Sequence, residues 1–386
     1  MDISYILNEL GEERENYFNA IAPPIVQTSN FQFKKVDEMR QTFKDEFKHY
    51  IYSRGINPTV DILRKKMAAL DEAEDALVFN SGASAIFCAV LANVKSGDHI
   101  LSVKDPYSWA QRLFNNILPR FNVSVTYIDG TSITNFEEAI RENTSIIYLE
   151  SPNSFMFQLQ DLRAISQLAK SKNIITIIDN SYCTPLYQKP ITLGIDLCLQ
   201  SATKYIGGHS DVVAGVLTGS HQLINKIFQS EYLNTGSGAT PFHAWLLIRG
   251  LRSLPARLDR ITHSTYQVVE AMKNHSKIER IIFPMDPSFP QYELAKKQMK
   301  NACGLFTFIL KTDSLEKIEK FCESLHHVMM AVSWGGHESL IIPKCASMEA
   351  HEFDAKNPEH RAVRMYVGLE SPEYIIADLT QALDKI

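Results

Sequence analysis

The stretch Ile174-Ile175-Thr176-Ile177-Ile178-Asp179 decides the fold, because it predicts a buried strand that ends in a carboxylate. A short run of Ile and Thr is typical of a strand covered on both faces, as in the parallel sheets of α/β proteins. Ligands of open α/β sheets bind outside the carboxyl ends of the strands. Asp179 is therefore expected at a ligand site.

A lysine surrounded by hydroxyl groups and glycines comes after the next predicted strand, in Gln200-Ser201-Ala202-Thr203-Lys204-Tyr205-Ile206-Gly207-Gly208. A desolvated lysine can lose its charge and form a Schiff base, and Ser201 and Thr203 offer hydrogen-bond donors to an anion. Pyridoxal phosphate requires both functions, and it also requires a carboxylate that keeps its ring nitrogen protonated. A core strand and a surface lysine would explain Asp179 or Lys204 alone. Together they predict a pyridoxal 5'-phosphate site.

Composition excludes several other classes of protein. A chain of 386 residues suits two domains, and 39 basic against 44 acidic residues leave no basic field for nucleic acid. No apolar run approaches about 18 residues, so no membrane segment is expected. The amino terminus lacks the basic and then apolar pattern of a signal peptide, which predicts a cytoplasmic protein.

No metal site is expected. The cysteines contain no C-x-x-C pair and lie in apolar segments, which favours buried free thiols over disulfides or zinc ligands. They are Cys88, Cys183, Cys198, Cys303, Cys322 and Cys345. His326 and His327 are adjacent, so on a helix their side chains would point in different directions.

Alternating strand and helix patterns predict an α/β large domain at residues 49–243, after an N-terminal arm at 1–48 that suits a neighbouring subunit. Seven apolar runs separated by helical periodicity indicate a mostly parallel seven-stranded sheet. The expected strands are 76–79, 99–103, 123–128, 145–149, 174–178, 197–200 and 213–218. Leu162, Ile165, Leu168 and Ala169 form one face of a covering helix.

Beyond Phe242 the pattern changes to long helices and separated strands. Leu246, Leu254 and Leu258 are spaced along one helical segment, and strands are expected at 305–310, 329–332 and 362–367. This arrangement predicts a smaller α+β domain at residues 244–386.

Ordered motifs along nearly the whole chain resemble the Cys/Met-metabolism (trans-sulfuration) family of pyridoxal-phosphate enzymes. They are Tyr52-Ser-Arg54 with Asn57-Pro-Thr59, Phe79-Asn-Ser-Gly82, Glu150-Ser-Pro152, Ser201-Ala-Thr-Lys204, Arg249-Gly-Leu-Arg252, Ser333-Trp-Gly-Gly336 and Val363-Arg364 with Val367-Gly-Leu-Glu370. The resemblance implies a large domain of fold type I, the pyridoxal-phosphate transferase fold. It also implies a homotetramer, built as a dimer of dimers, that acts on a small sulfur amino acid.

The cofactor's phosphate is expected at the start of a helix, because Gly82 follows the predicted strand 76–79 and lets backbone N–H groups approach an anion. The resemblance implies that the amides of Gly82 and Ala83 hold the phosphate, together with Ser201 and Thr203. It also implies that Tyr107 stacks on the ring and assists proton transfer. Two more residues, Tyr52 and Arg54, would reach the phosphate from a neighbouring subunit.

Arg364 is the candidate for binding the substrate α-carboxylate, since a buried arginine in a strand is costly without an anion. An intramolecular salt bridge is the alternative explanation. By resemblance, Ser333 assists Arg364, and Ser154 and Trp334 complete the substrate site.

Departures from the commoner family pattern guide the choice of reaction. The turns Ser151-Pro-Asn-Ser154 and Ser333-Trp334 resemble cystathionine β-lyases, so β-elimination of L-cystathionine to homocysteine, pyruvate and ammonia is the first hypothesis. Val332 fits neither the tyrosine of these β-lyases nor the glutamate of γ-enzymes, and Trp109 counts against a methionine γ-lyase, which would show a cysteine nearby. The alternative is γ-replacement or γ-elimination, as in cystathionine γ-synthase or γ-lyase. A non-enzymatic protein on the same fold is disfavoured by the presence of Lys204.

Overall fold

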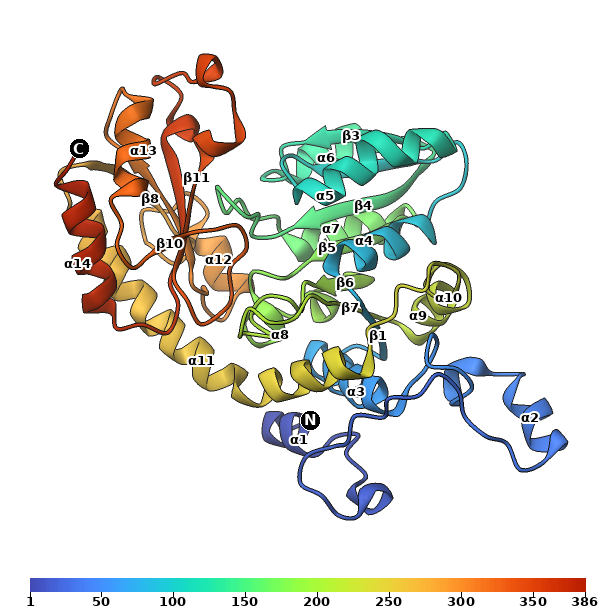
Figure 1. Ribbon diagram of the computed structural model, residues 1–386. Coiled ribbons are helices and arrows are strands. Elements are labelled where there is room, and N and C mark those ends of the chain that lie inside the picture. The colour runs from blue at the N-terminus through green and yellow to red at the C-terminus, as the bar shows by residue number, and fades with distance from the viewer.

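The computed structural model describes residues 1–386 and contains two sheets joined by a long helix, α11 (Figure 1). The larger sheet has the strand order β1-β7-β6-β5-β4-β2-β3. Its strands are β1 (Asp75–Phe79), β2 (His99–Val103), β3 (Ser124–Ile128), β4 (Thr144–Glu150), β5 (Ile175–Asp179), β6 (Leu197–Gln200) and β7 (Gly215–Gly219). The strands β3, β2, β4, β5 and β6 run parallel, and β7 is antiparallel to β6 and β1. The predicted mostly parallel seven-stranded sheet is confirmed.

Helices cover both faces of this sheet, because alternate strand residues point to opposite sides. Ile146, Tyr148 and Ile177 pack with α4 on one face, and Ile147 and Ile178 pack with α7 on the other. The helices of this part are α3 (Pro58–Asp71), α4 (Gly82–Leu91), α5 (Ser108–Arg112), α6 (Ile133–Ala139), α7 (Leu162–Ser171), α8 (Thr184–Tyr187), α9 (His221–Ile227) and α10 (Leu233–Thr235). The helices of both layers leave the carboxyl ends of the parallel strands uncovered, and the candidate site lies there.

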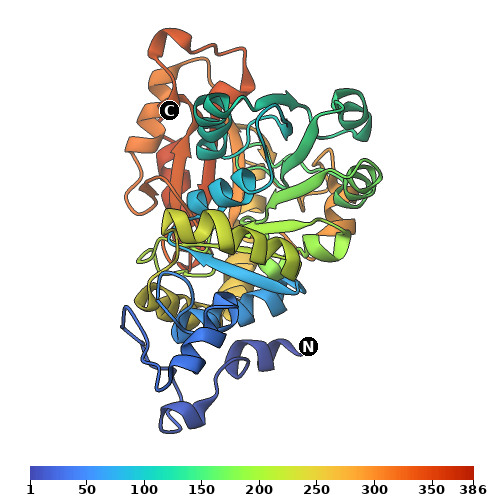
Figure 2. The same cartoon turned by 90° about the vertical axis from the view of Figure 1, so that its right-hand side faces the viewer.

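One helix connects the two sheets. Helix α11 (Pro241–Lys273) begins at Thr240, whose side chain accepts a hydrogen bond from the His243 N–H, and it continues through Pro255. It packs against α3 near one end and against α14 and β8 near the other. Figure 2, turned by 90°, shows the N-terminal segment in blue at the bottom of the molecule and much of the small domain in orange and red at the upper left. The predicted division between residues 243 and 244 falls in its first turn and stays a prediction.

The smaller domain holds a five-stranded sheet of order β10-β11-β12-β9-β8. Its elements are β8 (Ile278–Ile282), α12 (Tyr292–Gln298), β9 (Leu305–Leu310), α13 (Leu315–Glu323), β10 (Met329–Met330), β11 (Leu340–Pro343), β12 (Ala362–Tyr366) and α14 (Pro372–Leu383). Two of its strands were not predicted from the sequence: β8, whose alternation is broken by a register shift, and β11, which Pro343 ends after a short apolar run. The expected strand 329–332 stops at Met330, because exposed Met329 and Met330 pair only with β11.

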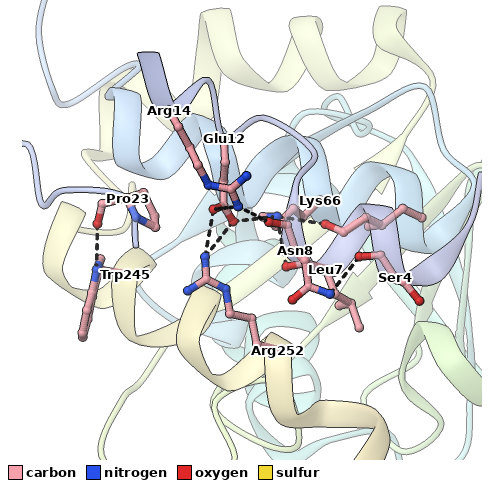
Figure 3. Close-up of polar contacts among 10 residues, drawn as sticks. Ser4, Leu7, Asn8, Glu12, Arg14, Pro23, Lys66, Trp245 and Arg252 are labelled. Carbon is pink, nitrogen blue, oxygen red and sulfur yellow. Dashed lines mark hydrogen bonds and ion pairs between the residues drawn. The ribbon is translucent and has the colours of Figure 1, made fainter. Parts of the chain in front are cut away.

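A buried ion cluster ties the N-terminal segment to its own chain (Figure 3). Helix α1 (Ile3–Asn8) precedes Glu12, which pairs with Lys66 of α3 at 3.0 Å and with Arg252 of α11 at 2.9 Å. Lys66 also donates to the carbonyls of Ile6 and Leu7. Helix α2 (Val36–Thr42) lies further along the same segment.

No helix in the chain combines the length and apolar character required to cross a membrane.

Candidate active site

The candidate site is a cavity of about 620 Å³ lined by residues from both domains. The large domain contributes the carboxyl ends of β4 and β5, the loop after β6 and the start of α4, and the small domain contributes β11, β12 and the turn at Ser333. The cavity therefore lies where open α/β sheets place their ligands. The structure brings together all the predicted site residues except Tyr52 and Arg54.

Asp179 faces the cavity from the end of β5, and Lys204 faces it from the loop that follows the neighbouring strand β6. Asp179 is the last residue of β5 and accepts a 2.9 Å hydrogen bond from the Ser181 N–H. Burial raises the pKa of this carboxyl, and Ser181 and the charge of Lys204 oppose the rise. Burial, helped by the charge of Arg364, lowers the pKa of Lys204 to about 8. A large fraction of the lysine can thus be a neutral amine near pH 8, as a nucleophile or base requires.

The turn at Ser333 approaches Lys204 closely. The Lys204 amine donates to the Ser333 Oγ at 2.5 Å, and Ser333 adopts a φ of 81°. This left-handed conformation costs a non-glycine residue about 1–3 kcal/mol, so the surroundings of the turn must hold Ser333 in it. A Cβ on Gly335 would lie 2.9 Å from the Lys204 Cα. Glycine is therefore required for the turn to sit against the lysine.

The start of α4 forms a cradle for an anion. Ser81 caps the helix by accepting the Ser84 N–H, which leaves the amides of Gly82 and Ala83 at the cavity. A Cβ on Gly82 would lie 3.2 Å from the Ser201 Oγ, so glycine keeps this space open. The hydroxyl of Thr203 is held by both backbone groups of Ala214. Amide N–H groups at a helix start and nearby hydroxyls fit the phosphate of pyridoxal 5'-phosphate.

Tyr107 precedes α5, and its backbone N–H donates to the Glu150 carboxylate at 2.6 Å. Its side chain is exposed to solvent on one side and lines the cavity. Glu150 begins the motif Glu150-Ser-Pro152, but its role was not predicted from the sequence. Burial is the main cause that raises the pKa of Glu150 to about 8, and the negative charge of Asp179 adds to it. The missed signal was the same as for Asp179, a carboxylate directly after an apolar strand.

Arg364 lies in β12 with 8% of its surface exposed, and it forms no ion pair within the chain. Its guanidinium donates to the carbonyl and hydroxyl oxygens of Ser154 at 3.2 and 3.4 Å. The intramolecular salt bridge considered from the sequence is therefore absent. A buried and unpaired guanidinium favours an anionic ligand, and its planar fork matches a carboxylate.

Trp334 combines packing with a place in the cavity wall. Its ring centroid lies 5.4 Å from that of Tyr205, and the Lys204 Nζ lies 5.3 Å from the same indole ring. Tyr52 and Arg54 are exposed and do not line the cavity of their own chain, although the Arg54 guanidinium lies 5.4 Å from the Tyr52 ring.

Comparison with known proteins agrees with this chemistry. A model of the family described as Cys/Met metabolism PLP-dependent enzyme matches residues 6–384. The chain belongs to this family. This Cys/Met-metabolism enzyme is 39% identical to the L-methionine gamma-lyase of Treponema denticola, over 96% of this chain and 94% of that protein. It is 32% identical to the cystathionine gamma-lyase of Bacillus subtilis, over 95% of each chain.

A solved structure supports the fold type I assignment. The crystal structure of metB from Corynebacterium glutamicum superimposes with a TM-score of 0.91 at 30% identity, covering 100% of this chain and 98% of that one. Membership in the family confirms the predictions of an enzyme and of pyridoxal phosphate as its cofactor. The γ-lyase names of these relatives favour the alternative of the sequence analysis over its first hypothesis, β-elimination. They also weaken the argument from Trp109 against methionine γ-lyases.

Proposed function

We propose that this enzyme cleaves the bond between Cγ and sulfur in a thioether of L-homocysteine. In this reaction the thioether and one water give a thiol, 2-oxobutyrate and ammonium. The structural observation that carries the proposal is the position of Lys204 between Asp179 and the unpaired Arg364 in one cavity. The γ-lyase relatives support cleavage at Cγ rather than at Cβ.

Residues of the chain would hold the cofactor at two points, one at its phosphate and one at its ring nitrogen. Gly82, Ala83, Ser201 and Thr203 hold the phosphate of the cofactor, which when bound supplies an electron sink for the substrate's carbanion. Asp179 keeps the ring nitrogen protonated.

Arg364, helped by Ser154 and Ser333, orients the substrate through its α-carboxylate. With the carboxylate fixed, the Lys204 Nζ takes the proton from Cα and later one from Cβ, which γ-elimination requires and β-elimination does not. The low pKa of Lys204 suits this role near neutral pH. Tyr107 covers the ring and assists proton transfer to the departing sulfur. Trp334 limits the space beside the carboxylate.

Tyr52 and Arg54 would complete the site of a second subunit. Both side chains are exposed and lie away from the cavity of their own chain, as a role in a neighbour's phosphate site requires. We therefore propose a homo-oligomer with sites shared in pairs of subunits, and the family resemblance favours a tetramer of two such dimers.

Product analysis tests the proposed reaction. The purified enzyme is incubated with L-cystathionine and separately with L-methionine, and the 2-oxo acids are separated by chromatography. We expect 2-oxobutyrate from at least one substrate and none from the Lys204→Ala variant. Pyruvate and homocysteine from L-cystathionine would instead establish β-elimination, and the absence of any 2-oxo acid from both substrates would refute the proposal.

A further inference from the structure

Two opposite charges of the small domain line the cavity without an ionic partner. Lys344 begins the 3₁₀ turn η7 (Lys344–Ser347), and Glu359 lies in the 3₁₀ turn η9 (Pro358–Arg361). The two turns pack against each other. Neither side chain forms an ion pair within the chain, with each other or with another residue. One cavity thus carries a free cation and a free anion on neighbouring turns.

The register of the small sheet places Lys344 on the same side as Arg364. Ile342 is the cross-strand partner of Arg364, and Lys344 follows Ile342 by two residues, which returns to the same face of an extended chain. The ring of Phe155 lies close to both cations. The Arg364 Cζ is 5.2 Å and the Lys344 Nζ is 5.0 Å from its centroid, so these two atoms are at most 10.2 Å apart.

The charges of Lys344 and Glu359 and their distance from Arg364 restrict the group that can lie at the end of the substrate's side chain. A molecule with its reacting α-carboxylate on Arg364 would bring the end of its side chain toward Lys344 and Glu359. A methyl group, as in methionine, would leave both charges unused. A second amino-acid group at the end of a short thioether chain offers a carboxylate to Lys344 and an ammonium to Glu359.

We propose that Lys344 and Glu359 determine substrate specificity by binding the far amino-acid group of a thioether that carries an amino acid at each end, as L-cystathionine does. The inference rests on the proposed function for the identity of the reacting end. It assigns the preference for a zwitterionic side chain to two residues outside the cofactor site. A substrate with only an anionic far end would use Lys344 and be repelled by Glu359.

The test compares kcat/KM for L-cystathionine with kcat/KM for L-methionine in matched variants. We expect Lys344→Met and Glu359→Gln each to lower the ratio of these values by more than about tenfold, mainly through KM for L-cystathionine. Lys344→Arg should retain most of the ratio. Lys356→Met, which removes an exposed lysine that does not line the cavity, should leave the ratio unchanged. A ratio unaltered by both Lys344→Met and Glu359→Gln would overturn the proposal.

Binding without turnover separates this proposal from the proposed reaction. In a Lys204→Ala background, calorimetry should give a Kd for L-cystathionine that is more than tenfold weaker when Lys344→Met is added. This result would support the subsite even if the wild-type enzyme released no 2-oxobutyrate. Tighter binding of L-cystathionine after Glu359→Gln would show that Glu359 repels the far carboxylate instead of binding the far ammonium, and an unchanged Kd in both variants would also contradict the proposal.

Discussion

Glu150 and Asp179 lie side by side as register partners at the carboxyl ends of β4 and β5, and both carboxyl groups are buried. Their roles differ because their surroundings differ. Asp179 faces Lys204 and the Ser181 N–H, whereas Glu150 receives the backbone N–H of Tyr107. Two like charges this close oppose each other's ionisation, which is why the charge of Asp179 adds to burial in raising the pKa of Glu150.

The contact between Glu150 and the Tyr107 backbone predicts a positioning role. Glu150→Ala leaves a buried N–H without an acceptor and frees Tyr107, so kcat/KM should fall by more than about tenfold. Glu150→Gln keeps an acceptor of the same shape and should lose less than about threefold. Steady-state kinetics of both variants, with thermal unfolding as the control for stability, checks this. Equal losses in the two variants would favour a role for the charge itself.

Asp71 should make stability depend on pH. This fully buried carboxyl accepts hydrogen bonds from Thr218 and Gln200, yet burial raises its pKa to about 7. The folded protein then holds a proton that the unfolded chain releases near pH 4, so the stability from this group is present at low pH and is lost as pH rises to about 7. The change is on the order of 4 kcal/mol for a shift of about three pKa units.

Urea unfolding between pH 4 and 8 measures this effect. Asp71→Asn cannot titrate, so the difference in unfolding free energy between wild type and Asp71→Asn should move in favour of the variant as pH increases. Two curves that stay parallel across this range would show that Asp71 keeps an ordinary pKa.

The buried pair of Glu12 and Lys66 should anchor the N-terminal segment. Lys66→Met removes a fully buried cation and leaves Glu12 with fewer partners, which should cost about 3–5 kcal/mol. Hydrogen exchange of the amides in α1 should increase at the same time. Lys65→Met is the matched control, because Lys65 is 43% exposed and its partner Asp61 keeps its ion pair with Arg64, so it should cost less than about 1 kcal/mol. Similar losses of unfolding free energy in both variants would contradict an anchoring role for the pair of Glu12 and Lys66.

Trp334 should affect both stability and catalysis. Trp334→Leu removes a ring that packs on Tyr205 and lies beside the Lys204 amine, so we expect a loss of about 2–4 kcal/mol and a more than tenfold lower kcat/KM. Trp245→Leu removes a partly buried tryptophan that donates to the Pro23 carbonyl and does not line the cavity. It should alter stability alone. A Trp334→Leu enzyme with normal kcat/KM would limit Trp334 to packing.

Mixing experiments test whether sites are shared between subunits. Tyr52→Phe and Lys204→Ala should each be nearly inactive, because each removes one half of a composite site. After dissociation and reassociation of a mixture, some dimers should contain one intact site and recover part of the activity. A mixture that stays inactive despite subunit exchange, shown by mass spectrometry of tagged chains, would mean that each chain builds its own site.

The sequence by itself determined the family, the cofactor and the large sheet. Apolar strands followed by Asp179 or by the Lys204 motif are local patterns, and local patterns depend on few contacts. The same reasoning located β9 at its observed bounds, but it missed β8, where a register shift breaks the alternation.

Only the tertiary structure decided the features that depend on which distant segments meet. Arg364 is left without an ion pair because β12 faces Ser154 rather than a carboxylate, and Glu150 has a role because β4 ends beside β5. Lys344 and Glu359 line the same cavity only because two short turns of the small domain pack together above it. Burial and pairing are properties of the folded surroundings, so the spacing of residues along the chain could not specify them.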